Sequence, residues 1–260
     1  MSAVINTNVR SMFASAALAT NERQMGVAMN QLSTGKRTYS ASVDAAGLAL
    51  ADKLTSQIRG TQMAVQNIND GISFLQTAEG ALNEVTNMGQ RMYELAVQLE
   101  NASLFDADQE ASIEAEMDDL GTAIDDIIAN TKWNGEATAD FSIDVTVTGD
   151  SAGTAATFAA TALGSTTPSS ASDKDDIATY LATVATQRGE AGSYINRLSY
   201  MADNLTNLAA NLSASRSRTQ DTDYAAASAE LARTQIVSQA ATAMLAQANQ
   251  SSQSVLSLLK

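Results

Sequence analysis

The stretch SDKDDIATYLATVATQRGEAGSYINRLSYMADNLTNLAANL, residues 172–212, carries the clearest structural pattern in the chain. Its apolar positions recur at steps of three or four residues, which is the repeat of one face of a long α-helix. The members of this series are Ile177, Leu181, Val184, Arg188, Ala191, Ile195, Leu198, Ala202, Leu205, Ala209 and Leu212. Arg188 is the one polar member. We therefore predict a helix over about 172–212 whose apolar seam is buried within the folded chain.

Two further helices are predicted in the first half of the chain. Over about 43–99 the apolar residues keep much the same spacing, and a helix of that length spans roughly 80 Å at about 1.5 Å per residue. A coiled coil holds such a helix more readily than a compact globular domain does. The seam residues that we expect to be buried are Leu54, Ile58 and Ile72. Asp106 with Gln109 resembles a capping box, which predicts the start of a third helix over about 106–130.

The spacing of apolar residues changes between the third and fourth helices. Asn134-Gly135 marks a turn, and residues 141–147 then alternate between apolar and polar side chains. This alternation is typical of a half-buried strand, and residues 154–163 can form its partner. We predict a small β-hairpin region at about 133–171, near the centre of an otherwise helical chain.

The two ends of the chain form matching terminal helices. Polar breaks at Ser33–Ser42 and Ser213–Asp223 separate these helices from the rest, and we interpret the two breaks as one joint made of two strands. The expected seam residues are Leu18, Met25, Met29 and Leu32 at the N-terminal end, and Leu231, Val237, Ala240, Met244, Val255 and Leu259 at the C-terminal end.

Together these elements predict a mainly α fold of long antiparallel helices. Residues 1–42 and 217–260 are the two halves of an inner terminal coiled-coil domain, and residues 43–216 form a coiled-coil-like rod that carries the hairpin. A helix pair as narrow as the terminal one buries too little area to offset roughly 1–2 kcal/mol of backbone entropy per residue. The seams at both ends therefore favour burial against neighbouring copies of the chain, as in a polymer.

The composition excludes several classes of function. The 260 residues contain no cysteine and no histidine, so a thiol nucleophile, a Ser-His-Asp triad or a histidine-bearing zinc site cannot be built. A formal net charge of −14 opposes general nucleic-acid binding, which needs a basic surface. No apolar run approaches the roughly 20 residues of a membrane span. We expect no catalytic, metal or cofactor site, no nucleic-acid partner, no membrane insertion and no cleaved signal peptide.

Two groups of short motifs lie towards the ends of the chain. In the first half they are Val4-Ile5-Asn6-Thr7-Asn8, Gln31-Leu32-Ser33-Thr34-Gly35-Lys36-Arg37, Asp44-Ala45-Ala46-Gly47, Asn69-Asp70-Gly71-Ile72-Ser73 and Thr77-Ala78-Glu79-Gly80-Ala81-Leu82. In the second half they are Ser215-Arg216-Ser217-Arg218, Asp221-Thr222-Asp223-Tyr224, Ala246-Gln247-Ala248-Asn249-Gln250 and Val255-Leu256-Ser257-Leu258-Leu259-Lys260. By these motifs, over about residues 1–135 and 173–260, the chain resembles the bacterial flagellins.

The resemblance implies a structural function. A flagellin polymerises through its N- and C-terminal helices into the bacterial flagellar filament that drives swimming, and this chain is similar to a short form without large outer domains. The implied partners are further copies of itself, a flagellar export chaperone, and the cap and hook-junction proteins. The implied location is the extracellular flagellum, reached through the flagellar type III apparatus. The hook–filament junction protein, a homologue, is the alternative, and the run Ala246 to Lys260 favours flagellin.

One stretch of the second helix resembles a recognition segment of the family. Residues 90–98 are similar to the part of flagellins that the vertebrate innate receptor Toll-like receptor 5 reads, and Glu116 matches its acidic partner on the next helix. We single out Gln90, Arg91, Leu95 and Glu116 as an exposed surface for contacts between subunits in the filament. The resemblance also makes the monomer a candidate ligand of this receptor.

Overall fold

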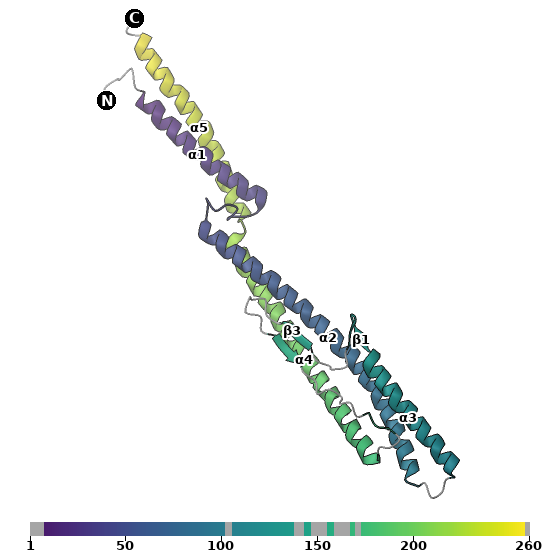
Figure 1. Ribbon diagram of the computed structural model, residues 1–260. Helices are drawn as coiled ribbons and strands as arrows, with labels where there is room; N and C mark the ends of the chain where they lie inside the picture. Colours follow the sequence, from purple (N-terminus) through teal and green to yellow (C-terminus); the bar gives the residue numbers. More distant parts are fainter. Residues whose placement is uncertain are drawn as a thin grey trace. The chain divides into compact units, whose positions relative to one another are not determined.

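The computed structural model describes residues 8–101, 106–137, 143–146, 155–158, 167–169 and 173–257. The chain is mainly α-helical, as predicted (Figure 1). Its helices are α1 (Val9–Thr34), α2 (Ala45–Leu99), α3 (Ala107–Asn130), α4 (Lys174–Gln220) and α5 (Tyr224–Ser257). Its short strands are β1 (Lys132–Trp133), β2 (Glu136–Ala137), β3 (Ile143–Thr146) and β4 (Ala155–Phe158).

The chain divides into two compact units. Met1–Ser56 and Leu212–Lys260 form one, which we call the terminal unit, and Gln57–Asn211 form the other, the central unit.

The central unit has an apolar core to which α2, α3, α4 and β3 all contribute. Because the apolar positions of each helix recur every three or four residues, each helix buries one stripe of its surface. The fully buried members with the largest side chains are Ile68, Leu75, Leu82, Val85, Met92 and Leu95 of α2, Met117 and Ile124 of α3, and Ile177, Val184 and Leu198 of α4. Val145 of β3 belongs to this core, and the partly buried Trp133 of β1 packs against it.

Between α3 and α4 in the sequence, the described residues form two short hairpins. β1 and β2 pair antiparallel across Asn134-Gly135, whose φ angles of 52° and 87° are both positive. The type I′ turn of a two-residue hairpin needs positive φ at both positions, and Asn-Gly is strongly preferred there. The sequence predicted this turn but not the strands beside it. β3 and β4 also pair antiparallel, with Ile143 opposite Phe158. They lie inside the predicted strands 141–147 and 154–163, whose remaining residues are outside the described part of the chain.

In the terminal unit α1 and α5 run antiparallel, side by side (Figure 1). The Asn8 side chain caps the start of α1 by accepting a hydrogen bond from the backbone N–H of Ser11 at 3.1 Å. The helix ends at Gly35, whose φ of 68° is left-handed and is therefore readily adopted by glycine. The apolar seam between α1 and α5 is narrow. The surfaces of the two helices outside this seam are therefore candidates for assembly contacts.

The predicted joint between the two ends forms as a single bridge. The backbone N–H of Arg37 donates to the carbonyl of Gln220 at 2.6 Å, and that of Thr222 donates to the carbonyl of Gly35 at 3.0 Å. These bonds surround one antiparallel bridge between Lys36 and Asp221. The prediction of two strands overstated the joint, because α4 takes up most of the residues on its C-terminal side.

The fourth helix is longer than the sequence predicted. The prediction ended it at residue 212, with Ser213–Asp223 as a polar break, whereas α4 continues to Gln220. The added residues include neither proline nor glycine, and the Thr219 hydroxyl donates to the carbonyl of Ser215 at 3.0 Å within the helix. Polar residues alone do not end a helix when the backbone can still make its own hydrogen bonds.

Candidate assembly surface

The inner sides of α1 and α5 form a narrow seam of small and polar residues. Its buried or partly buried members, spaced by three or four positions, are Leu18, Asn21, Met25, Ala28 and Leu32 of α1 and Leu231, Thr234, Ser238, Ala241, Leu245 and Ala248 of α5. The sequence prediction placed Met29 in this seam, but Met29 is 53% exposed. Strict alternation of steps of three and four from Leu18 leads instead to Asn21 and Ala28. The polar character of Asn21 hid this position from a search for apolar residues.

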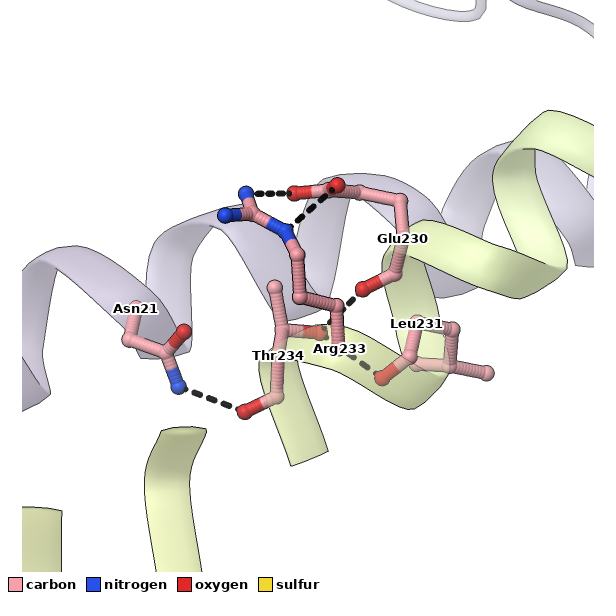
Figure 2. A network of polar contacts seen from close by, with 5 residues as sticks. All are labelled: Asn21, Glu230, Leu231, Arg233 and Thr234. Carbon is pink, nitrogen blue, oxygen red and sulfur yellow. Dashed lines mark hydrogen bonds and ion pairs between the residues drawn. The ribbon is translucent and has the colours of Figure 1, made fainter. Parts of the chain in front are cut away.

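Two asparagines of α1 donate hydrogen bonds to the backbone of α5. The side-chain amide of Asn21 reaches the carbonyl of Thr234 at 2.7 Å, as Figure 2 shows. Asn21 is 6% exposed and Thr234 1% exposed, so this bond is shielded from water. Nearer the chain ends, the side-chain amide of Asn8 reaches the carbonyl of Ala248 at 3.2 Å. A buried amide costs free energy unless it is paired, so the Asn21 contact holds the two helices in relation to one another. The part-buried Asn8 contact adds a second link between them.

An ion pair of α5 lies beside the buried amide of Asn21. The Arg233 guanidinium donates to both carboxylate oxygens of Glu230, at 3.0 and 2.7 Å (Figure 2). These hydrogen bonds lower the pKa of Glu230 and raise that of Arg233. Both side chains are largely exposed, so solvent screens the pair and its effect on stability is small.

Large apolar side chains of both helices lie outside the seam and are exposed in the single chain. They are Val9, Met12, Phe13 and Met29 of α1, and Tyr224, Ile236, Val237 and Met244 of α5. Phe13 is 73% exposed and Ile236 is 66% exposed. Large exposed apolar side chains are a mark of interaction sites in proteins. The terminal unit is therefore two-sided: α1 and α5 bury one seam against each other, and large apolar side chains outside that seam stay exposed.

Part of the predicted apolar side of the last helix stays exposed. Val237, Ala240 and Met244 were expected in the seam, whereas all three are exposed and α5 packs on α1 through the side that holds Thr234 and Ala241. Of the predicted members, Leu231 does lie in the seam. α1 is one helix wide and covers a single stripe of α5, so the neighbouring stripe stays uncovered. Val255 and Leu259, also predicted, lie outside the described side chains.

The second predicted surface lies on α2 and α3 of the central unit. The Arg91 guanidinium donates to Oε1 of Glu116 at 3.0 Å and 2.9 Å, and to Oε2 of Glu94 at 3.2 Å. Glu116 is the main cause of the raised pKa of Arg91, followed by Glu94. Gln90, Arg91 and Glu116 are all exposed. Leu95 is not part of this surface, because it is 1% exposed and belongs to the core.

The burial of Leu95 has a simple geometric cause. Positions 92, 95, 96 and 99 of α2 face the core, at the spacing that places them on one side of a helix. Residues 90, 91 and 94 lie on the opposite side and are exposed. A segment that resembles a recognition motif thus contains both surface and core positions.

The residues predicted to form the intrasubunit seam are buried to different degrees. Leu198 is fully buried, Ile58 is buried, and Ile72, Ile195 and Leu205 are partly buried where they pack against the central core. Leu54 is buried and Leu212 partly buried, and both fall within the terminal unit. The sequence predicted substantial burial of Leu205 and Leu212 within one chain, and both are partly buried. Leu198 lies where α2, β3 and α4 meet, whereas Leu205 lies at the edge of the core.

Among the described residues, no helix is both long and apolar enough to cross a membrane. In the same part of the chain, no three His, Cys, Asp or Glu side chains are grouped so that they could hold a metal ion.

Known proteins match the chain along its whole length. The bacterial flagellin N-terminal helical region matches residues 5–140, and the bacterial flagellin C-terminal helical region matches residues 175–259. Flagellin of Halalkalibacterium halodurans is 38% identical over an alignment that covers 99% of this chain and 100% of that protein. The flagellar filament 33 kDa core protein of Treponema phagedenis is 36% identical, with 99% and 100% covered. Flagellin of Bacillus subtilis is 34% identical, with 98% and 99% covered.

Proposed function

Because this chain belongs to the bacterial flagellin family, we propose that it is a structural subunit that polymerises through α1 and α5 into the bacterial flagellar filament. Its relatives carry the names flagellin and filament core protein, and it spans their full length. These relatives do not favour the hook–filament junction protein as the alternative. The family's function is structural, and we assign the chain no catalytic role.

The observation that carries the assembly route is the two-sided terminal unit. α1 and α5 bury their small-residue seam against each other and leave Phe13, Ile236 and Met244 exposed. Covering one large apolar side chain contributes roughly 1.5–3 kcal/mol. Neighbouring copies that cover several of these side chains in each subunit gain enough to hold a polymer together.

We also propose separate roles for the terminal and central parts of the chain. Residues 1–42 and 217–260 act as the inner assembly domain, and residues 43–216 act as the rod. On the rod, Gln90, Arg91 and Glu116 provide a second contact between subunits. Their exposure and the Arg91–Glu116 ion pair support this role, since the pair orients both side chains at the surface. Leu95 supports the same segment from the core side.

The remaining partners follow from family membership. We assign a flagellar export chaperone, the cap protein and the hook-junction proteins as partners, with export through the flagellar type III apparatus to the extracellular filament. In the same way, the surface formed by Gln90, Arg91 and Glu116 makes the monomer a candidate ligand of Toll-like receptor 5.

Seeded polymerisation tests the assembly route. The double variant Met12→Gln with Met244→Gln replaces two exposed side chains of the terminal unit, and Met63→Gln is the matched control because Met63 is 55% exposed in the central unit. The double variant should elongate filament seeds poorly in electron micrographs, while Met63→Gln elongates them as the wild type does. Thermal melting of the monomers checks that all chains are folded. Normal elongation by the double variant, or equal loss in the control, would contradict assembly through α1 and α5.

A further inference from the structure

The two asparagine contacts define one alignment of α1 against α5. Asn8 and Asn21 are 13 positions apart on α1, and their acceptors Ala248 and Thr234 are 14 positions apart on α5. The two contacts therefore belong to a common antiparallel register. Beyond the end of α1, the side chain of Arg37 donates to the carbonyl of Thr219 in α4 at 2.7 Å, which ties the loop after α1 to the end of α4.

The rest of the seam does not select this register strongly. The α5 seam positions recur at steps of three and four, so a slip by seven residues brings seam positions against α1 again, with Ser238 exchanged for Leu231 or Leu245. A slip of that size moves one helix along the other by about 10 Å. Helical periodicity alone would tolerate several alignments of such a seam.

The carbonyl that accepts from Asn21 has a feature that a slipped register lacks. In an α-helix the side chain of residue i+4 lies over the carbonyl of residue i. That residue is Ser238 for the Thr234 carbonyl. After a slip by seven residues, Asn21 would face the carbonyl of Ala227 or Ala241 instead. Those carbonyls lie under Leu231 and Leu245, which would leave the amide of Asn21 buried without an acceptor.

We propose that Asn21 is a register-determining residue of the terminal unit, acting through the Thr234 carbonyl that Ser238 leaves accessible. This inference rests on the proposed assembly function. The register sets where Met12 and Phe13 of α1 stand relative to Met244 of α5, and these are the side chains offered to neighbouring copies. A polymer of identical subunits needs the same pattern on every copy, so a slipped subunit would not fit the growing end.

Disulfide cross-linking reads the register directly, because the natural chain contains no cysteine. The reporter Ala14→Cys with Ala241→Cys matches the observed register, and Ala14→Cys with Ala248→Cys matches a slip by seven residues. Each reporter is combined with Asn21→Leu, with Ser238→Leu or with Asn30→Leu. Asn21→Leu removes the donor, and Ser238→Leu covers the acceptor while Asn21 stays in place. Asn30→Leu is the control, since Asn30 is an exposed asparagine of the same helix.

The expected result is a change of alignment and not a loss of folding. Both Asn21→Leu and Ser238→Leu should raise the ratio of slipped to in-register cross-link by roughly fivefold or more, as expected when a buried amide loses its partner. Seed elongation should fall in parallel, and Asn30→Leu should match the wild type in both assays. An unchanged cross-link ratio in Asn21→Leu or in Ser238→Leu would overturn the inference while leaving the assembly function standing. Failure of the wild-type chain to elongate seeds would contradict the assembly function instead, whatever the cross-links show.

Discussion

Val145 of β3 occupies a notch that Gly71 leaves in α2. A β-carbon built on Gly71 would lie 2.6 Å from Cγ2 of Val145 and 3.7 Å from Cδ1 of Leu198. Real β-carbons do not approach other atoms as closely as 2.6 Å, so any side chain at position 71 would push the strand away. The hairpin is thus seated on the central core by the absence of one methyl group.

Gly71→Ala should therefore lower the free energy of unfolding, by about 1–3 kcal/mol, the usual cost of overpacking a core. Gly80→Ala is the matched control, because Gly80 also lies within α2 but nothing stands within 4 Å of its missing β-carbon. There, alanine should stabilise the helix by roughly 0.5–1 kcal/mol. Urea unfolding followed by circular dichroism measures both changes. The two changes in unfolding free energy need not be equal in size. An increase in unfolding free energy for Gly71→Ala would contradict the notch.

When leucines of the fourth-helix seam are replaced by alanine, the loss of unfolding free energy should be larger for the more deeply buried leucine. Leu198→Ala should cost about 2–5 kcal/mol, because it removes a fully buried side chain and leaves a cavity. Leu205→Ala should cost clearly less, since Leu205 is partly buried at the edge of the core and solvent can fill the space. Thermal and urea unfolding of the two monomers provides the comparison. The ordering would be wrong if Leu205→Ala proved the more harmful change.

Tyr180 should make the free energy of unfolding fall at alkaline pH. Burial, with a smaller contribution from Asp125, raises the pKa of Tyr180 to about 12 from its model-peptide value of 10.0. Above the lower value the unfolded chain loses a proton that the folded chain keeps, so the contribution is complete below about pH 10 and is lost as pH rises to about 12. Tyr180→Phe should weaken this loss of unfolding free energy, measured by urea titrations across that range.

The same variant should behave differently near neutral pH. The hydroxyl of Tyr180 is buried and has no hydrogen-bond partner among the described residues. Its removal should leave stability at pH 7 unchanged or slightly higher, because no bond is lost. Tyr200→Phe, at a 76% exposed tyrosine of the same helix, is the control and should keep the wild-type alkaline profile. A marked destabilisation by Tyr180→Phe at pH 7 would point to a hydrogen bond made by this hydroxyl.

Arg91→Ala should separate folding from assembly. The ion pair with Glu116 is exposed on both sides, at 51% and 47%, so solvent and salt screen it and the monomer should melt almost as the wild type does. Filament elongation should fall, because the variant removes a side chain of the proposed second contact. Glu116→Gln, which keeps the shape of its partner, should show the same pattern. Wild-type elongation by both variants would remove this surface from the assembly contacts.

The sequence by itself determined the helices, the central hairpin and the narrowness of the terminal seam. Each of these follows from local periodicity: steps of three and four for α2, α3 and α4, alternation for β3, and Asn134-Gly135 for the first turn. The motifs at both ends also pointed to the flagellin family without any knowledge of the fold. Such features depend on residues a few positions apart, which a sequence displays directly.

Only the tertiary structure decided which side of each element meets a partner. α5 carries two candidate stripes, and the position of α1 determines that Thr234 and Ala241 face inwards while Val237 and Met244 stay exposed. Leu95 and Gln90 share one motif, yet the neighbouring α3 and α4 bury the first and leave the second at the surface. The partners of Asn21 and Gly71 lie 213 and 74 positions away in the chain, at Thr234 and Val145. Contacts over such separations depend on how helices pack, and helical periodicity says where a stripe lies but not what covers it.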